Sequence, residues 1–385
     1  MRLTICLLFA LATAAAHPLL VISVDGLDWR YLRDADKLGL KIPHIRQLMR
    51  QGEVTQGIVG VAPTVTWPSH TSLITGARPA GHGILGNRRP NGGDYYWTTD
   101  FLQRKTLWHA TRAAGLKSAS ITWPVTVNAD IDFNLPEAFS GRNGGAMDYA
   151  TIAAKASPAD LAEQIRLKYP SFGAEWVDDR ARALATMFLL SQKKPDLLLL
   201  HFVDLDSEAH SQQPYSRGSN AILEYTDELI GRILSVTPKD YVVCLTSDHG
   251  FEPVHRLVHP KVVAADVWVV PGLAIAQSAG AVAKLRGREG VGREVPMEEV
   301  RRYAPHYPAG VAAFEPAPET MFGSGTKEWQ TAFHHGEHGF WPTRADYRSV
   351  LVLTGPGIRP GLVPELSMTD IAKRWASILG VRMLP

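Results

Sequence analysis

The sequence predicts an α/β fold in which a mostly parallel central sheet is covered by helices on both faces. Apolar runs with the length of buried strands alternate with segments that carry helical start and stop signals, an order typical of parallel sheets. Three of the runs end in aspartate, at the edge where such sheets bind ligands. The chain has 385 residues, of which 45% are hydrophobic, so it is long enough to bury a large core.

The predicted strands are mostly continuous apolar runs, without the alternation of a strand that faces water on one side. Such runs are typical of strands buried on both faces. They cover residues 18–24, 118–122, 197–203, 241–246 and 349–353.

The predicted helices are mostly bounded by proline in the first turn or by glycine after the last turn, the usual positions of these residues. They cover residues 43–51, 68–75, 103–114, 220–234 and 369–379.

Two stretches interrupt the alternation of strands and helices. We expect a single catalytic domain over residues 17–385, with insertions at about 88–194 and 251–331, the second forming a small cap. The apolar stretch 267–285 contains Pro271 and Gly272, which favours a core or cap element over a membrane span.

The first sixteen residues resemble a signal peptide. Arg2 is followed by an uncharged apolar run that ends in alanines, and this run is shorter than the ~20 residues that span a bilayer. We therefore expect cleavage after Ala16, no stable membrane anchor, and a secreted or periplasmic protein. Cys6 would leave with this segment and Cys244 would remain, so any metal site must use histidine and carboxylate ligands.

The charges nearly balance, with 40 Lys and Arg against 38 Asp and Glu and a formal net charge of +2. A nucleic-acid polymer or an anionic membrane surface would require a basic excess. The composition therefore favours a small-molecule substrate, and any attraction for an anion must be local.

Four separated segments offer metal ligands, three of them directly after predicted strands. Each has an ordinary explanation alone, such as a helix cap or an i,i+4 pair, but together they predict a metal centre. Oxygen and nitrogen ligands without cysteine favour zinc over manganese or iron. Three carboxylates with two divalent cations would leave a local charge of about +1. The ligands are Asp25, Asp206 with His210, Asp248 with His249, and His338.

A candidate nucleophile lies in the segment 62–76. Pro68 is suited to open a helix, which places Thr66 at or just before the helix N-terminus, where the dipole favours negative charge. Coordination to a divalent cation would lower the pKa of its hydroxyl and permit attack on phosphorus. The alternative is that Thr66 only caps the helix.

These motifs together resemble the alkaline phosphatase superfamily, and within it the type I phosphodiesterase/nucleotide pyrophosphatase branch. The resemblance runs from Val21 to about Gly380. Its motifs are Val24-Asp-Gly, Pro63-Thr-Val-Thr-Trp-Pro-Ser-His, His82-Gly-Ile-Leu-Gly-Asn, Thr122-Trp-Pro-Val, Asp206-x-x-x-His, Ser247-Asp-His-Gly, His338-Gly-Phe and Thr369-Asp-Ile-Ala.

The resemblance implies an alkaline-phosphatase-like fold and two zinc ions at the active site. It implies two in-line displacements through a phosphothreonine at Thr66, with Asn87 donating a hydrogen bond to a non-bridging phosphate oxygen. The implied ligands are Asp25, Asp248, His249 and Thr66 for one zinc, and Asp206, His210 and His338 for the other.

The residues around the metal motifs favour a diesterase. Thr66 and Asn87 stand where the superfamily's monoesterases use serine and arginine. A phosphomonoesterase, a phosphonate hydrolase and a non-catalytic metal-binding relative remain open. Trp67 is a candidate wall for the leaving group and His201 a candidate base-stacking residue, although both are equally compatible with packing. Nucleotides, glycerophosphodiesters and lipid head groups all remain possible substrates.

Overall fold

The centre of the molecule is an eight-stranded sheet, seen in a computed structural model that describes residues 16–385 except 91, 141–146 and 174–175. The predicted signal peptide therefore lies outside the described residues, apart from Ala16. The order of the strands is β18-β2-β17-β7-β1-β6-β4-β5. Their bounds are β1 Leu19–Val24, β2 Glu53–Thr55, β4 Ser118–Ile121, β5 Phe133–Leu135, β6 Leu197–Phe202, β7 Val242–Thr246, β17 Leu351–Thr354 and β18 Gly361–Val363.

Most of this sheet is parallel, as the sequence predicts. Strands β7, β1, β6, β4 and β5 run in one direction. At the other edge, β17 pairs antiparallel with β7 and with β2, and β18 pairs parallel with β2. Five parallel neighbours bring the carboxyl ends of β1, β6 and β7 to one edge, where a ligand site is expected.

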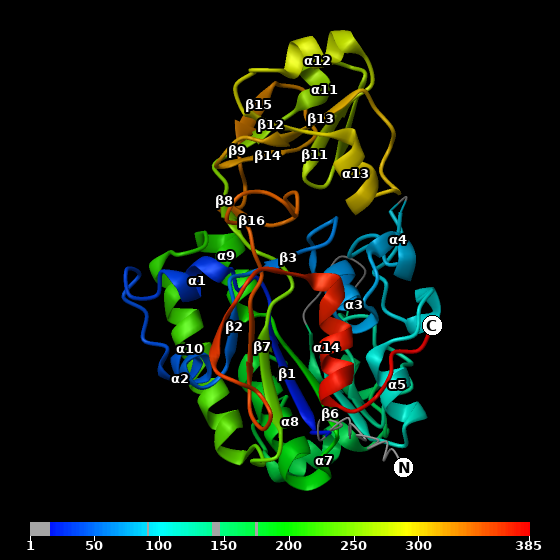
Figure 1. Cartoon of the computed structure of the whole chain (residues 1–385), viewed down its shortest axis with the longest axis vertical. Coiled ribbons are helices and arrows are strands. Elements are labelled where there is room, and N and C mark those ends of the chain that lie inside the picture. The colour runs from blue at the N-terminus through cyan, green and yellow to red at the C-terminus, as the bar shows by residue number, and fades with distance from the viewer. Residues whose placement is uncertain (1–15, 91, 141–146, 174–175) are drawn as a thin grey trace, which may run out of the picture.

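Helices cover both faces of the sheet, which confirms the predicted layers (Figure 1). Leu20 and Ile22 of β1 belong to one buried cluster, and Leu19 and Val21 belong to another. The first cluster includes buried residues of α2, α8 and α10, and the second those of α3, α5 and α14. The bounds of these helices are α2 Pro43–Gln51, α3 Thr66–Thr75, α5 Leu107–Ala113, α8 Asp179–Phe188, α10 Arg217–Val236 and α14 Ile371–Ile378.

Shorter elements connect the main strands and helices. They are α1 Trp29–Arg33, β3 Ile58–Val59, α4 Pro79–His82, η1 Thr99–Phe101, α6 Tyr149–Ala153, α7 Leu161–Lys168, the π-helix η2 Leu189–Lys193, α9 Asp204–Gln212, β19 Leu366–Ser367 and η3 Met368–Asp370.

A smaller lobe lies above the sheet in Figure 1 and is joined to it by β8 and β16. It occupies the region where a cap was expected. Its apolar stretch includes β11, all four residues of which are buried, and no helix among the described residues is long and apolar enough to cross a membrane. Its elements are β8 Glu252–Pro253, β9 Arg256–Val258, α11 Pro260–Val263, β10 Val267–Val270, β11 Leu273–Ala276, α12 Ala279–Leu285, β12 Val291–Val295, α13 Met297–Tyr303, β13 Ala312–Pro316, β14 Thr320–Phe322, β15 Trp329–Thr331 and β16 Gly336–Glu337.

Two sequence expectations differ from the structure. Residues 88–194 were expected to leave the core, but β4 and β5 within them are hydrogen-bonded into the central sheet. The helix expected from residue 103 begins at Leu107, because the side chains of Thr106 and His109 form a capping box at that point.

The N-terminus of α9 is held by a buried side chain of another helix. Helix α9 has no side-chain cap of its own. Instead, the N–H groups of Val203 and Asp204 donate to the carboxylate of Asp179 at 2.8 and 3.1 Å. Arg182 pairs with the same carboxylate at 2.7 Å, and both side chains are buried. This network fixes the helix that carries two of the predicted metal ligands.

We therefore predict that Asp179→Ala lowers the free energy of unfolding by roughly 2–4 kcal/mol, because it removes the carboxylate that accepts from two partly buried N–H groups and pairs with the buried Arg182 guanidinium. Urea unfolding of the metal-free protein measures this loss. Arg180→Ala, at an exposed neighbouring position of α8, is the control and should stay within about 0.5 kcal/mol. Equal effects of the two substitutions would contradict the capping role.

Candidate active site

The predicted metal ligands converge at the carboxyl edge of the sheet. Asp25 directly follows β1, Asp206 and His210 lie on α9 after β6, and Asp248 and His249 follow β7 after one intervening residue. His338 comes from a separate loop, just after β16, where the chain returns from the smaller lobe. The structure thus brings together side chains that are up to 313 residues apart (Asp25 to His338).

The first ligand group consists of Asp25, Asp248 and His249. Their ligand atoms all lie within 4.8 Å of one another. His249 Nε2 is 3.3 Å from Asp25 Oδ1 and 3.1 Å from Asp248 Oδ2. The N–H of Gly26 donates to the other oxygen of Asp248 at 3.2 Å, which orients that carboxylate. All three side chains are buried.

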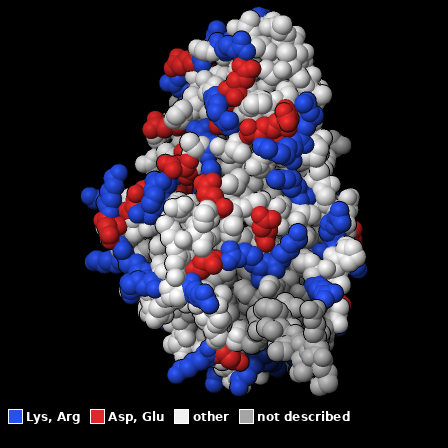
Figure 2. All heavy atoms as spheres, viewed as in Figure 1, with Lys and Arg blue, Asp and Glu red and all other residues white. Residues whose placement is uncertain are grey.

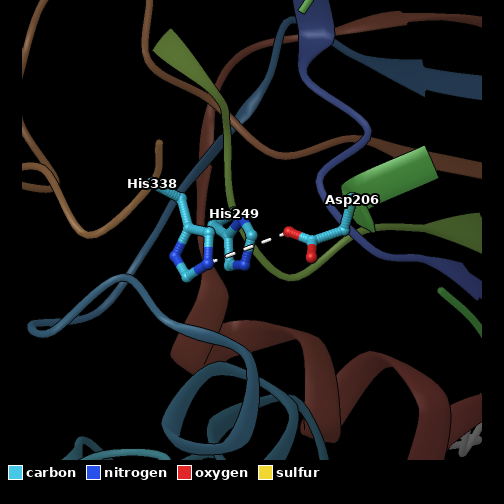
Figure 3. A group of neighbouring side chains, drawn as sticks. All are labelled: Asp206, His249 and His338. Atoms are coloured by element: carbon cyan, nitrogen blue, oxygen red, sulfur yellow. Dashed lines mark ion pairs between the residues drawn. The ribbon is translucent and has the colours of Figure 1, made fainter. Parts of the chain in front are cut away.

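The second ligand group is built around Asp206. Its Oδ1 lies 3.6 Å from His210 Nε2 and 3.8 Å from His338 Nε2. The dashed line in Figure 3 joins Asp206 and His338. The imidazoles of His249 and His338 stack at 3.8 Å between ring centroids, so the two groups are adjacent. Backbone carbonyls fix two of the rings, because His210 Nδ1 lies 3.0 Å from Gly336 O and His338 Nδ1 lies 3.3 Å from Thr64 O.

The chemistry of these atoms fits divalent cations. Four of them are buried and have no hydrogen-bond partner in the structure: Asp25 Oδ1, Asp206 Oδ1, Asp248 Oδ2 and His249 Nε2. Burial raises the pKa of all three carboxyl groups, and it lowers the pKa of His249 and brings that of His338 to about 3. Neutral imidazoles and unpartnered carboxylate oxygens are the ligands that Zn²⁺ binds.

A third group of possible ligands shares His210 with the second. It consists of His210, His334 and Glu337. A carboxylate oxygen of Glu337 lies 3.5 Å from His210 Nδ1, the ring nitrogen that faces away from Asp206, and the other lies 2.6 Å from His334 Nδ1. Carboxylates in this position orient metal-binding histidines. Glu337 is therefore placed to orient the ring of His210 toward Asp206.

Thr66 is the first residue of α3, and Val65 is the N-cap. No side chain makes a capping hydrogen bond there, so the structure does not support a simple capping role for the Thr66 hydroxyl. The helix N-terminus has no acidic residue in its first turn and offers its N–H groups and dipole to an anion. His70, one turn later, has Nδ1 2.8 Å from the Thr66 carbonyl oxygen and Nε2 2.9 Å from Ser23 Oγ, which ties α3 to β1.

Asn87 lies beside the start of α3. Its side-chain Oδ1 accepts a hydrogen bond of 3.0 Å from the N–H of Trp67. This bond identifies the oxygen end of the amide and holds it next to the residue that follows Thr66. The Nδ2 group is not needed for this bond and is the end of the side chain that can donate to an anion.

The structure contradicts a base-stacking role for His201. The side chain is fully buried on β6 and offers no ring face to a ligand. Its Nε2 lies 3.1 Å from Asp25 Oδ2, and its Nδ1 lies 3.1 Å from Glu137 Oε2. His201 therefore connects a predicted metal ligand to a second buried carboxylate, an arrangement that positions Asp25.

Trp67 has only 2% of its surface exposed. Its indole N–H donates to Glu137 Oε1 at 3.1 Å, and its ring packs against Tyr95 and Trp97. The side chain thus has little free surface to serve as a wall for a leaving group. Glu137, which holds both Trp67 and His201, was not predicted from the sequence because no motif marks a lone glutamate in a Pro- and Ala-containing loop.

The chain is similar to known proteins over most of its length. The profile of the family "Type I phosphodiesterase / nucleotide pyrophosphatase" matches residues 19–341. Human ectonucleotide pyrophosphatase/phosphodiesterase family member 1 is 24% identical over 61% of this chain, and human member 7 is 26% identical over 66% of it. The matches span 24% and 54% of those two proteins.

Solved structures show the same fold. The human ectonucleotide pyrophosphatase/phosphodiesterase 5 structure superposes with a TM-score of 0.68 over 96% of each chain, at 18% identity. An inactive murine form of that protein in complex with AMP also gives 0.68, at 17% identity. The fold, and a family profile that matches most of the sequence, lead to one conclusion: the chain belongs to the type I phosphodiesterase/nucleotide pyrophosphatase family.

Proposed function

We propose that this chain is a two-metal hydrolase of phosphodiesters that acts through a covalent phosphothreonine at Thr66. One observation carries the proposal: six potential ligands from separate segments meet at one sheet edge, and four of their buried atoms have no hydrogen-bond partner. A protein without a cation there would leave two buried carboxylates and one partly buried carboxylate uncompensated, which is energetically costly.

Each group of side chains has a distinct role in the proposed reaction. Two divalent cations, zinc by the chemistry of the ligands, would stabilise charge on the attacking and leaving oxygens. The Thr66 Oγ attacks phosphorus from the N-terminus of α3, and the N–H groups there favour the anionic phosphoryl group. The Asn87 amide supplies a further donor for a non-bridging oxygen. His201 and Glu137 hold Asp25 from behind.

Water completes the cycle by attacking the phosphothreonine on the face opposite Thr66. This second displacement restores the Thr66 hydroxyl and releases a phosphomonoester. A diester is the expected substrate, since the chain belongs to a family of phosphodiesterases and nucleotide pyrophosphatases.

We also propose that the substrate is a small molecule and that the protein acts outside the cytoplasm. Lys and Arg side chains are interspersed with Asp and Glu on the face in Figure 2, which shows no broad basic surface for a polymer. Export follows from the leader-like residues 1–16 and agrees with the relatives, whose names describe ectoenzymes.

We expect the purified protein to hydrolyse bis(p-nitrophenyl) phosphate after zinc is added, and to lose this activity when a chelator removes the metal. The same preparation should cleave p-nitrophenyl phosphate more slowly. Faster cleavage of the monoester would reassign the protein as a monoesterase. Hydrolysis of neither substrate by the zinc-loaded protein would refute the enzymatic function.

Thr66→Ala should lower kcat for the diester by at least about a thousandfold, because it removes the nucleophile. The metal content, measured by elemental analysis, should remain at two ions per chain, since six other ligands persist. Thr75→Ala, at the other end of the same helix, is the matched control and should keep full turnover. Unchanged turnover in Thr66→Ala would remove Thr66 from the mechanism.

A further inference from the structure

A cavity of about 420 Å³ lies between the smaller lobe and the loop that precedes α3. The lobe contributes residues of β10 and β14, including Val269, Val270, Met321 and Phe322. By comparison, a cavity of about 150 Å³ is enough to bind benzene. The space can therefore hold an aromatic ring or a short alkyl chain together with the atoms that link it to phosphorus.

The cavity borders the proposed reaction centre. Val65, which lines it, directly precedes Thr66, and His338, a member of the second ligand group, lines it as well. In an in-line displacement the leaving oxygen departs on the side opposite the Thr66 Oγ, where the second cation would stabilise it. A leaving group that departs past His338 enters this cavity.

The lining of the cavity does not suit an anion. Most of its described residues are apolar or glycine, and none is Lys or Arg. The charged side chain that does line it is Glu337, a carboxylate. Arg344 contacts the lining residues Pro316 and Phe340 but is buried between the carboxylates of Glu252 and Glu315. The outer phosphate of a pyrophosphate leaving group needs cationic side chains, which this lining lacks.

We propose that this cavity is the leaving-group subsite and that it selects an uncharged apolar alcohol or phenol over pyrophosphate. The inference rests on the proposed function, because it assumes cleavage at phosphorus by Thr66. It adds the class of the leaving group: the preferred substrates are phosphodiesters with an aryl or alkyl ester and not nucleoside triphosphates.

The test compares two substrates that share one retained group, the p-nitrophenyl ester of AMP and ATP. In both, a bond forms between Thr66 Oγ and the α-phosphorus, the leaving oxygen departs with its bonding electrons, and water then cleaves the Thr66–phosphorus bond. The products are AMP with either nitrophenol or pyrophosphate. We expect kcat/KM for the aryl ester to exceed that for ATP by at least about a hundredfold.

Met321→Lys places a cation in the cavity and should shift the ratio of the two kcat/KM values by about tenfold toward ATP. Val262→Lys, at an exposed position of the same lobe away from the cavity, is the matched control and should leave the ratio unchanged. Val270→Lys, on a different strand of the lining, repeats the test if Met321→Lys does not fold. If the ratio of the two kcat/KM values is unchanged in a folded cavity variant, the cavity is not the leaving-group subsite. A preference of the unaltered enzyme for ATP would also overturn this assignment.

A binding measurement provides a readout that does not depend on turnover. The zinc-loaded Thr66→Ala variant is labelled with ¹³C at its methionine methyl groups, and the Met321 signal is assigned by its loss in Met321→Leu. The p-nitrophenyl ester of AMP should shift this signal, and ATP should not. A signal that neither ligand moves, in a protein whose parent cleaves both substrates, would overturn the subsite while leaving the proposed function intact. Loss of all hydrolysis would refute the proposed function itself.

Discussion

The site is governed by one electrostatic constraint: two buried carboxylates, Asp25 and Asp248, and the partly buried carboxylate of Asp206 lie at a single edge of the sheet. Asp25 and Asp248 both contact His249 Nε2, and Asp206 lies beside the adjacent His338. Two unit charges ~4 Å apart interact by roughly 4 kcal/mol at the effective dielectric constant of a protein surface. Like charges so close together require either protonation or a counter-charge, and neutral histidines provide none. Divalent cations satisfy this requirement and use the unpartnered oxygens at the same time.

The surrounding fold brings the three carboxylates together and holds them in place. Parallel pairing of β1 with β6 and β7 brings the three aspartates to one edge, and Asp179 fixes the N-terminus of the helix that carries Asp206. His201 holds Asp25 from inside the sheet, and Glu137 holds His201 and Trp67 together. The smaller lobe returns the chain at His338 and forms one wall of the adjacent cavity. The contacts of Asp179 and His201 thus position Asp206 and Asp25 without a bound metal.

The sequence predicted the fold class and the segments of the site because those signals are local. Buried parallel strands are continuous apolar runs, and each of the three aspartates follows one within a few residues along the chain. The contacts made by His201 could not be predicted in the same way, since its partners Asp25 and Glu137 lie 176 and 64 residues away. The addition of β5 to the central sheet was missed for a similar reason, although the neighbouring strand at residues 118–122 was predicted. Strand β5 is three residues long, and only its pairing with β4 distinguishes it from part of an insertion.

Anomalous diffraction at the zinc edge, from crystals of the zinc-loaded protein, tests the central claim most directly. The account predicts two peaks, one between Asp25, Asp248 and His249 and the other between Asp206, His210 and His338. A single peak would contradict it, and so would a second peak among His210, His334 and Glu337 in place of the position beside Asp206.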